Sequence, residues 1–132
     1  MVRSDDVPRR LLATIDALAL AAFVLVGVRS HHDAEGLRLL ARNAVPLEAS
    51  WFVVAALFGA YRRPGIRTLL ATWAVAVPTG LLVRSAWIGS PAGARLLLFL
   101  GVGLVFTLLF LLVGRALAAM IARRVLPAGR RT

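Results

Sequence analysis

The stretch Arg95–Val113, with the sequence RLLLFLGVGLVFTLLFLLV, decides the fold of this chain. It carries no charged side chain after Arg95, and its Leu, Val and Phe residues would surround a helix on all sides instead of forming one apolar stripe. An α-helix rises about 1.5 Å per residue, so a run of this length covers roughly 27 Å, close to the ~30 Å hydrocarbon core of a bilayer. The stretch therefore predicts a transmembrane helix that continues toward Ala122.

Three more apolar segments are long enough to span a bilayer: Leu11–Val28, Ala44–Tyr61, and Thr68–Val83 or slightly beyond. Lipid cannot satisfy the unpaired backbone groups at a strand edge, so helices are expected here instead of open strands. We therefore predict an all-α membrane protein with a single domain over residues 1–132. Its four transmembrane helices are expected at about 11–28, 44–61, 68–86 and 95–120.

Two short connections predict that these helices form an antiparallel bundle. The segments Arg62–Gly65 and Ser90–Gly93 each contain Pro and Gly, which are typical of a tight turn. A short turn brings the helices on either side together as antiparallel neighbours. The second and third helices, and the third and fourth, are therefore expected to pack against each other.

The first connection, Ser30–Asn43, is longer than the other two. It places the leucines at positions 37, 39 and 40 beside Arg38 and Arg42. Apolar side chains mixed with arginines are typical of a helix that lies in the membrane interface. We therefore predict a short interfacial helix between the first and second transmembrane helices.

The composition supports a membrane protein and excludes several other classes. The chain is 60% apolar and has a net charge of +10, from 16 arginines and no lysine against six acids. The arginines lie between and beyond the apolar runs, and no basic run carries interleaved aromatic residues, so nucleic acid is not an expected partner. The absence of cysteine from the sequence excludes disulfides, thiolate metal sites and thiol nucleophiles.

The arginines also predict the orientation, because cytoplasmic loops of membrane proteins are enriched in basic residues. One side of the four-helix arrangement holds eleven of them: Arg3, Arg9, Arg10, Arg62, Arg63, Arg67, Arg115, Arg123, Arg124, Arg130 and Arg131. The other side holds five: Arg29, Arg38, Arg42, Arg84 and Arg95. We therefore predict a multi-pass protein of the cell inner (plasma) membrane with both termini in the cytoplasm.

Asp16 lies inside the first apolar segment, roughly 8 Å from its cytoplasmic end. The apolar run continues to Val28, which argues against a cleaved signal peptide. A carboxylate at membrane depth is costly and is expected to face protein or a cavity, and Arg115 is the cation nearest to it in depth. Asp16 and Arg115 are thus a candidate polar pair on the inner side, either as a structural ion pair or as a site that handles protons or a substrate.

A second group of polar residues is expected near the outer face. Glu48 lies four residues into the second segment and Arg84 ends the third at a similar depth, so we expect the two to meet. Arg29 and the only histidines of the chain follow the first segment on the same side. The candidate polar cluster on the outer side is therefore Arg29, His31, His32, Glu48 and Arg84, although the histidines also suit a purely interfacial role.

The third segment contains Pro78-Thr79-Gly80 near its middle. Proline removes a backbone hydrogen bond and glycine permits close approach, so a kink at Pro78 and Gly80 is predicted. Kinked helices often line sites, but they are also common in membrane helices generally.

No catalytic or metal-binding constellation is evident. Adjacent histidines on a helix point roughly 100° apart, and no further His or Cys completes a metal or haem site. The sequence also has no Ser-His-Asp order and no glycine-rich phosphate loop. We therefore predict no metal and no cofactor, and assign no catalytic residue.

The order of these features resembles the family of small bacterial and archaeal membrane proteins known as domain of unknown function 3054. The resemblance covers most of the chain and rests on short motifs: Asp16, the Gly-x-Arg-Ser-His string Gly27–His31, Pro46, Trp73, Gly80, the Leu-x-Arg string Leu82–Arg84, and the pair Gly114 and Arg115. It implies a four-helix membrane protein and gives weight to Asp16, Arg29, His31 and Arg84 as a set. The family has no known activity, so the resemblance implies no substrate.

Three functions stay open at the level of sequence. The first is a small carrier or channel for a small polar or anionic solute or for protons, as a homo-oligomer because four helices enclose little volume. The second is a non-catalytic subunit or scaffold that binds another membrane protein through faces of small residues. An enzyme acting on lipid is a third reading, with only His31, His32 and Glu48 to support it. The expected partners are the lipid bilayer and either a second copy or another membrane protein.

Overall fold

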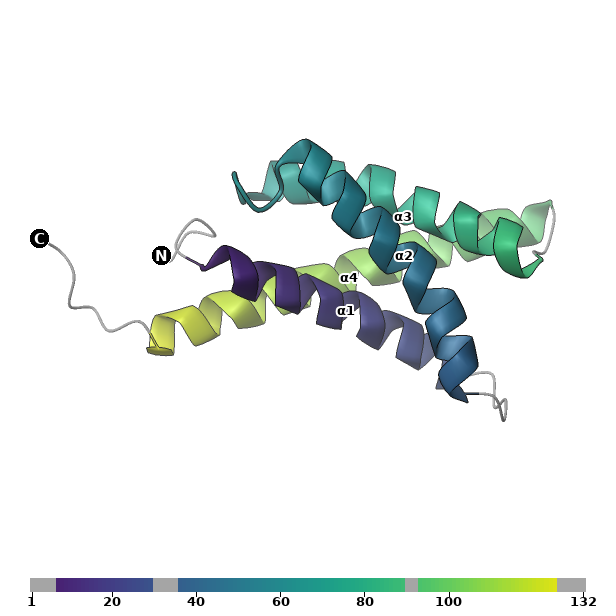
Figure 1. Cartoon of the computed structure of the whole chain (residues 1–132), viewed down its shortest axis with the longest axis horizontal. Coiled ribbons are helices and arrows are strands. Elements are labelled where there is room, and N and C mark those ends of the chain that lie inside the picture. Colours follow the sequence, from purple (N-terminus) through teal and green to yellow (C-terminus); the bar gives the residue numbers. More distant parts are fainter. Residues whose placement is uncertain (1–6, 30–35, 90–92, 126–132) are drawn as a thin grey trace, which may run out of the picture.

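The computed structural model describes residues 7–29, 36–89 and 93–125. These residues form four α-helices and no strand, which confirms the prediction of an all-helical chain (Figure 1). The helices are α1 (Arg9–Arg29), α2 (Gly36–Phe58), α3 (Ile66–Ile88) and α4 (Ala94–Val125).

Three of the four helices, α1, α3 and α4, are long and apolar enough to cross a membrane. The remaining helix, α2, is not among them, because Arg38, Arg42 and Glu48 interrupt its apolar run. The composition of the three apolar helices supports a membrane protein, as the sequence predicted.

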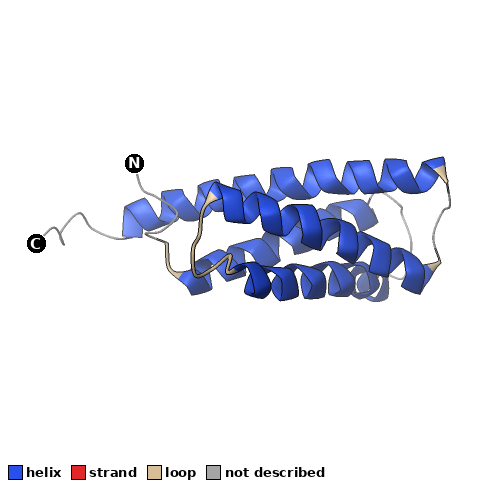
Figure 2. Cartoon of the chain, turned by 90° about the horizontal axis from the view of Figure 1, so that it is seen from above, coloured by secondary structure: helices blue, strands red, loops and turns tan. Residues whose placement is uncertain are grey.

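The helices α1, α3 and α4 lie lengthwise along the molecule, α2 crosses obliquely, and the chain reverses direction after each helix (Figures 1 and 2). The most extensive contacts join α2 to α3 and α1 to α4, and further contacts join α1 to α2 and α3 to α4. The first turn of α1 and the last turns of α4 therefore lie at the same end of the molecule as the turn between α2 and α3.

The start of α2 differs from the prediction. The segment after Gly36, expected to be a separate interfacial helix, forms the first two turns of α2, which continues through Pro46 to Phe58. No glycine or proline interrupts the chain between Gly36 and Pro46, so nothing in this segment stops the helix. Pro46 leaves only the carbonyl of Arg42 without its intrahelical donor.

The end of α2 also comes earlier than predicted, at Phe58 instead of Tyr61. Gly59 adopts a positive φ of 67°, a conformation that glycine reaches without steric cost. The N–H of Gly59 donates to the carbonyl of Ala56 (3.3 Å) and that of Ala60 to the carbonyl of Ala55 (2.9 Å), which is the Schellman pattern of helix ends. Tyr61 consequently belongs to the turn between α2 and α3.

The core has two parts along the molecule. The larger cluster is centred on side chains that are completely covered, one from each helix: Leu20, Trp51, Val77 and Leu111. The smaller cluster joins the start of α1 to the end of α4: Val7, Leu12, Ala118 and Ala122. All four helices therefore pack together in the middle of the molecule, and α1 and α4 also pack against each other at the end where α1 begins.

Close packing of α2 on α3 depends on Gly80. A Cβ atom at this position would lie 2.9 Å from the Cα of Leu47 and 3.2 Å from the carbonyl oxygen of Pro46. Such distances are too short for a real side chain next to backbone, so glycine is required at this contact. Gly80 therefore sets which residues of the two helices lie opposite each other.

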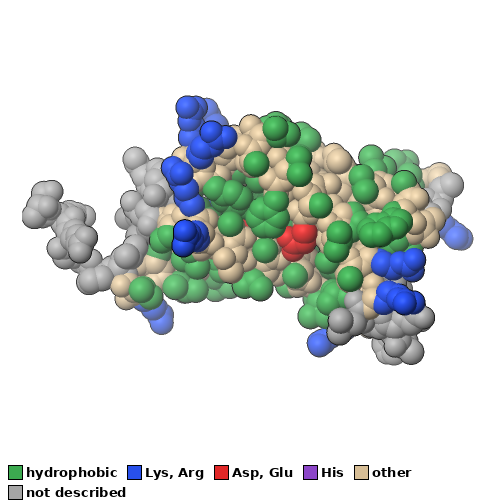
Figure 3. Space-filling model, viewed as in Figure 1, with side chains coloured by type: hydrophobic (Ala, Val, Ile, Leu, Met, Phe, Trp, Pro, Cys, Tyr) green, Lys and Arg blue, Asp and Glu red, His purple; other side chains and the backbone are tan. Residues whose placement is uncertain are grey.

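On the face shown in Figure 3, basic side chains lie apart from most apolar ones, and an acidic side chain is visible in the middle of the apolar region. Large exposed apolar residues occur on every helix, for example Leu18, Leu57, Trp87 and Leu97. Arginine side chains gather toward the two ends of the molecule, with apolar side chains between them. A soluble protein rarely exposes so much apolar surface, whereas a membrane protein presents it to lipid.

Candidate functional site

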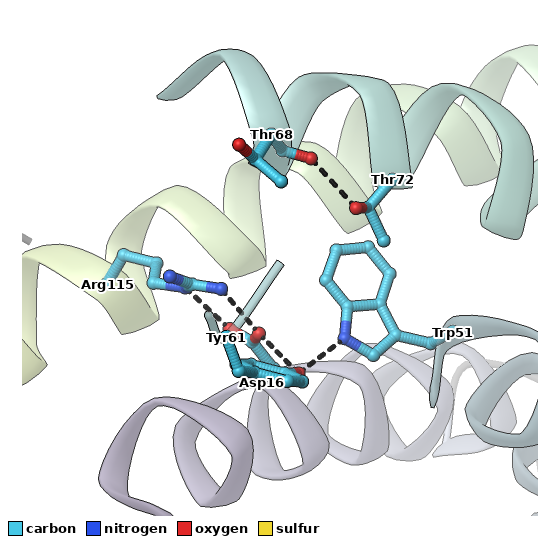
Figure 4. Close-up of polar contacts among 6 residues, drawn as sticks. All are labelled: Asp16, Trp51, Tyr61, Thr68, Thr72 and Arg115. Carbon is cyan, nitrogen blue, oxygen red and sulfur yellow. Dashed lines mark hydrogen bonds and ion pairs between the residues drawn. The ribbon is translucent and has the colours of Figure 1, made fainter. Parts of the chain in front are cut away.

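Asp16 is the one charged residue among the described residues whose side chain is fully buried, with no exposed surface. Arg115 of α4 holds it through two parallel bonds: Nε donates to Oδ1 (2.8 Å) and Nη2 donates to Oδ2 (2.7 Å) (Figure 4). Paired bonds of this kind are among the strongest that two side chains form. The structure therefore joins the first and last helices through an ion pair.

Two aromatic side chains extend this contact into a network. The hydroxyl of Tyr61, in the turn after α2, donates to Oδ2 of Asp16 (2.8 Å). The indole N–H of Trp51 in α2 donates to the same tyrosine oxygen (2.9 Å). The buried network of Asp16, Arg115, Tyr61 and Trp51 thus connects α1, α2, the α2–α3 turn and α4 (Figure 4); it is referred to below as the Asp16 network.

Helical spacing explains why these side chains converge. On α1 the buried positions Leu12, Asp16 and Leu20 recur every four residues, so Asp16 occupies the core-facing stripe. On α4 the same stripe runs through Leu111 and Ala118, and Arg115 lies between them. Asp16 and Arg115 therefore point into the bundle because of their positions in otherwise apolar stripes.

The electrostatics of the Asp16 network are balanced. The carboxylate accepts two hydrogen bonds from the cationic Arg115 and one from the neutral Tyr61 hydroxyl. The positive charge of Arg115 balances the negative charge of Asp16. Burial, and next the charge of Asp16, raise the pKa of the Tyr61 phenol above its ordinary value. Tyr61 therefore stays a neutral donor, and the network holds its charges without a net excess.

Arg84 contacts a different partner from the one expected. Its Nε donates to Oδ1 of Asn43 (2.6 Å), and its guanidinium carbon lies 4.8 Å from the centre of the Phe99 ring. The predicted meeting of Arg84 with Glu48 is therefore wrong. Gly80 packs on Leu47, and α2 and α3 run in opposite directions. One turn after Gly80 on α3 is Arg84, which therefore lies beside Asn43, one turn before Leu47 on α2.

Glu48 lies deeper than the sequence suggested. Since α2 begins at Gly36 and ends at Phe58, Glu48 is roughly 18 Å from one end of the helix and 15 Å from the other. Within the described part of the chain its Oε2 atom is covered and has no hydrogen-bond partner. Glu48 is therefore an incompletely satisfied acid near the middle of a helix, not a member of an outer rim.

The remaining candidates are spread over the molecule. Arg29 is the exposed last residue of α1, whereas His31 and His32 lie outside the described residues. The described residues therefore do not assemble the predicted outer cluster. Pro78 and Gly80 lie within α3, which stays helical through both of them.

Four residues of these contacts are not identified by the sequence analysis: Trp51, Tyr61, Asn43 and Phe99. A usable signal existed for Tyr61, which is the only tyrosine of the chain and follows a glycine at the end of an apolar segment. Nothing in the sequence around Trp51 indicates an acceptor for its indole N–H. Among residues 7–29, 36–89 and 93–125, no group of three or more His, Cys, Asp or Glu residues comes together that could hold a metal ion.

Comparison with known proteins gives one match. No curated protein and no solved structure matches the chain. The model of a family described as "Protein of unknown function (DUF3054)" matches residues 13–118, a segment that begins just before Asp16 and ends just after Arg115. Because this match covers most of the chain, the protein belongs to the DUF3054 family.

Proposed function

We propose that this protein crosses the inner membrane four times as an antiparallel helical bundle with both termini in the cytoplasm. The three apolar helices support this topology, and α2 packs along two of them. The charged residues Arg38 and Arg42 lie in the first two turns of α2, from which long side chains extend to the headgroups. After Ala44, the helix carries only Glu48 as a charged residue.

The orientation can be tested with reporters of compartment. After Gly65, a reporter enzyme that works only in the cytoplasm is expected to be active. Just before Gly36, a reporter enzyme that works only in the periplasm is expected to be active. This follows from the larger number of arginines at the end that contains the α2–α3 turn. Cytoplasmic activity of the fusion before Gly36 would contradict the topology.

For the biochemical role, the proposal is a small carrier of protons or of a small polar solute. The observation that supports it is Glu48, a carboxylate at mid-helix depth with a covered and unpartnered oxygen among the described residues. An acid inside a membrane is expensive and usually marks an ion or substrate pathway. A purely structural acid would be expected to have its hydrogen bonds satisfied, as Asp16 has.

The two acids then have separate roles. Asp16 is fixed between α1 and α4 by its network, so it holds the helices in register. Glu48 lies on α2, the one described helix that is not among the three apolar candidate spans, and binds the proton or the polar group of the solute. A carrier of this kind operates as an oligomer, because a single bundle has most of its interior filled by the core clusters.

The decisive experiment measures proton movement in liposomes that contain the purified protein and a pH-sensitive dye. With a potassium diffusion potential across the membrane, the unaltered protein is expected to acidify or alkalise the interior faster than empty liposomes. Glu48→Gln is expected to abolish the difference, and Glu48→Asp, the matched control that keeps the acid, to retain part of it. Equal rates for the unaltered protein and Glu48→Gln would refute this role for Glu48.

A second role, that of a non-catalytic subunit or scaffold, is supported by the Asp16 network itself. An ion pair whose carboxylate is fully covered and held by two hydrogen bonds from Arg115 fixes the relative positions of helices, which a rigid subunit requires. Extraction in mild detergent is then expected to yield a second membrane protein in fixed stoichiometry. Repeated purification of the chain alone, in an active transporting form, would exclude this alternative.

A further inference from the structure

A groove of about 390 Å³ opens at the end of the molecule where α1 begins. It lies between the start of α1 and the turn that joins α2 to α3, and its lining consists of Val7, Arg9, Tyr61, Arg62, Arg63 and Pro64. This volume is roughly ten times the ~30 Å³ that a water molecule occupies in the liquid, so it has room for a substituted phosphate group. The groove is separate from Glu48 and plays no part in the proposed carrier role.

The lining of the groove is strongly cationic. Three of the six described residues that line it are arginines, and none of these six is acidic. Within the described part of the chain the guanidinium groups of Arg9 and Arg63 form no ion pair, whereas Arg62 donates from Nη2 to the carbonyl of Ala56 at 3.3 Å. Guanidinium groups match the geometry of phosphate oxygens with paired hydrogen bonds.

Two helix termini add to this positive field. α1 begins at Arg9, which lines the groove, and α3 begins at Ile66, two residues after Pro64 of the lining. The N-terminus of a helix carries a partial positive charge and favours anions nearby. The arginines and both helix ends therefore attract the same kind of ligand.

The rest of the lining is apolar and fixed in place. The Tyr61 ring packs against Phe52 with the ring centres 6.3 Å apart, and its hydroxyl is held by Asp16. Val7 is buried, and Pro64 closes the turn beside it. A rigid apolar wall beside three arginines fits a ligand that has both a phosphate group and a hydrocarbon part.

We propose that the groove formed by Arg9, Tyr61, Arg62 and Arg63 is a binding site for a phosphate group, supplied by an anionic phospholipid of the cytoplasmic leaflet. The end of the molecule at which it lies is the one assigned to the cytoplasm. A lipid headgroup placed there reaches the arginines while its glycerol and upper acyl carbons contact Val7 and Pro64.

The test uses the full chain in a neutral detergent and measures lipid binding by native mass spectrometry. Short-chain phosphatidylglycerol is compared with phosphatidylcholine of the same chain length. The unaltered protein is expected to bind phosphatidylglycerol at least about tenfold more tightly, and Arg62→Gln/Arg63→Gln to lose most of this preference, because basic residues supply the attraction for anionic lipid.

The matched control is Arg123→Gln/Arg124→Gln, which removes the same charge from the same end of the molecule at exposed positions that do not line the groove. This control is expected to keep the preference. An equal loss in both double variants would mean diffuse attraction and would overturn the site, as would the absence of any preference in the unaltered protein. Circular dichroism and gel filtration verify that both variants fold.

A second measurement separates the two sources of phosphate. Inorganic phosphate at millimolar concentration is added to the complex with phosphatidylglycerol. Little displacement supports a lipid site, because the apolar wall contributes to binding. Complete displacement, together with direct phosphate binding that is lost in Arg62→Gln/Arg63→Gln, would overturn the lipid as ligand and assign the groove to the free anion.

Discussion

Asp16 shows how one acidic residue becomes tolerable inside an apolar helix. Its carboxylate accepts two hydrogen bonds from Arg115 and one from Tyr61, and neither oxygen is exposed. The cost of removing a charge from water is large, and only a partner of opposite charge with good geometry offsets it. At the scale of single residues, the stability of the bundle therefore depends on keeping this set of partners complete.

Replacing Asp16 with Asn is expected to destabilise the folded protein by about 3–5 kcal/mol, because the guanidinium of Arg115 loses its counter-charge in a covered site. Thermal unfolding in detergent, followed by circular dichroism, measures this. The double variant Asp16→Leu/Arg115→Leu removes both charges together and is expected to recover part of the loss. A double variant less stable than Asp16→Leu alone and than Arg115→Leu alone would contradict this account.

Replacing Tyr61 with Phe is expected to cost about 1–3 kcal/mol, because the indole N–H of Trp51 loses its acceptor and Asp16 loses one donor. The matched control is Thr14→Val, which removes an exposed hydroxyl that bonds only to the carbonyl of Arg10. The melting temperatures of the two variants give the comparison. Equal melting temperatures for both variants would show that the Tyr61 hydroxyl contributes no more to stability than the exposed Thr14 hydroxyl.

At the scale of elements, the helices themselves could be predicted from the sequence, but the ends of α2 could not. Long apolar runs define a helix that can cross lipid, and the structure has helices in all four places. The start of α2 depends on Gly36–Asn43, whose mixed apolar and basic character suits an interfacial helix as well as the first turns of a longer one. The end depends on the positive φ of Gly59, which the sequence does not announce, because other glycines such as Gly80 and Gly101 lie within helices.

The ends of the helices determine which side chains meet, so predictions about contacts in the site depend on them. Depth along the helices suffices to place Asp16 and Arg115 at the same level, and the structure has them in contact. Pairing Glu48 with Arg84 also needs the register of α2 on α3, which the close contact at Gly80 sets. That contact is a property of three-dimensional packing and is not encoded in any local pattern.

Replacing Gly80 with Ala is expected to destabilise the protein by about 1–3 kcal/mol, because the added methyl group would meet the backbone of α2 at 2.9 Å. Gly101→Ala is the matched control on α4, where an added Cβ meets nothing within 4 Å. This control is expected to be neutral or slightly stabilising, since alanine favours a helix over glycine. Comparable melting temperatures for the two variants would show that α2 and α3 do not depend on close approach at Gly80.

At the scale of the whole molecule, the length of α4 is the notable dimension. Its 32 residues extend over roughly 48 Å, which exceeds the ~30 Å hydrocarbon core of a bilayer. Arginines lie near both of its ends, and the part after Arg115 packs against the first turns of α1. The last turns of α4 are therefore expected to lie beyond the hydrocarbon core on the cytoplasmic side.

Single cysteines provide a test against a clean background, because the natural chain has none. Val125→Cys at the end of α4 and Val105→Cys in its middle replace the same residue type at similarly exposed positions. A charged maleimide is expected to label Val125→Cys in inside-out vesicles and to leave Val105→Cys unlabelled. Labelling of both positions, or labelling of Val125→Cys only from the outside, would contradict the placement of α4.

The ion pair between Asp16 and Arg115 also affects the order in which the protein is assembled. The two residues are 99 positions apart, so α1 leaves the ribosome well before its partner on α4 has been synthesised. Until then an unpaired carboxylate in the bilayer costs about 2.5–3.5 kcal/mol on insertion scales. We expect α1 to stay beside the insertion machinery while α2 and α3 enter, and the arrival of α4 to release the completed bundle into the lipid.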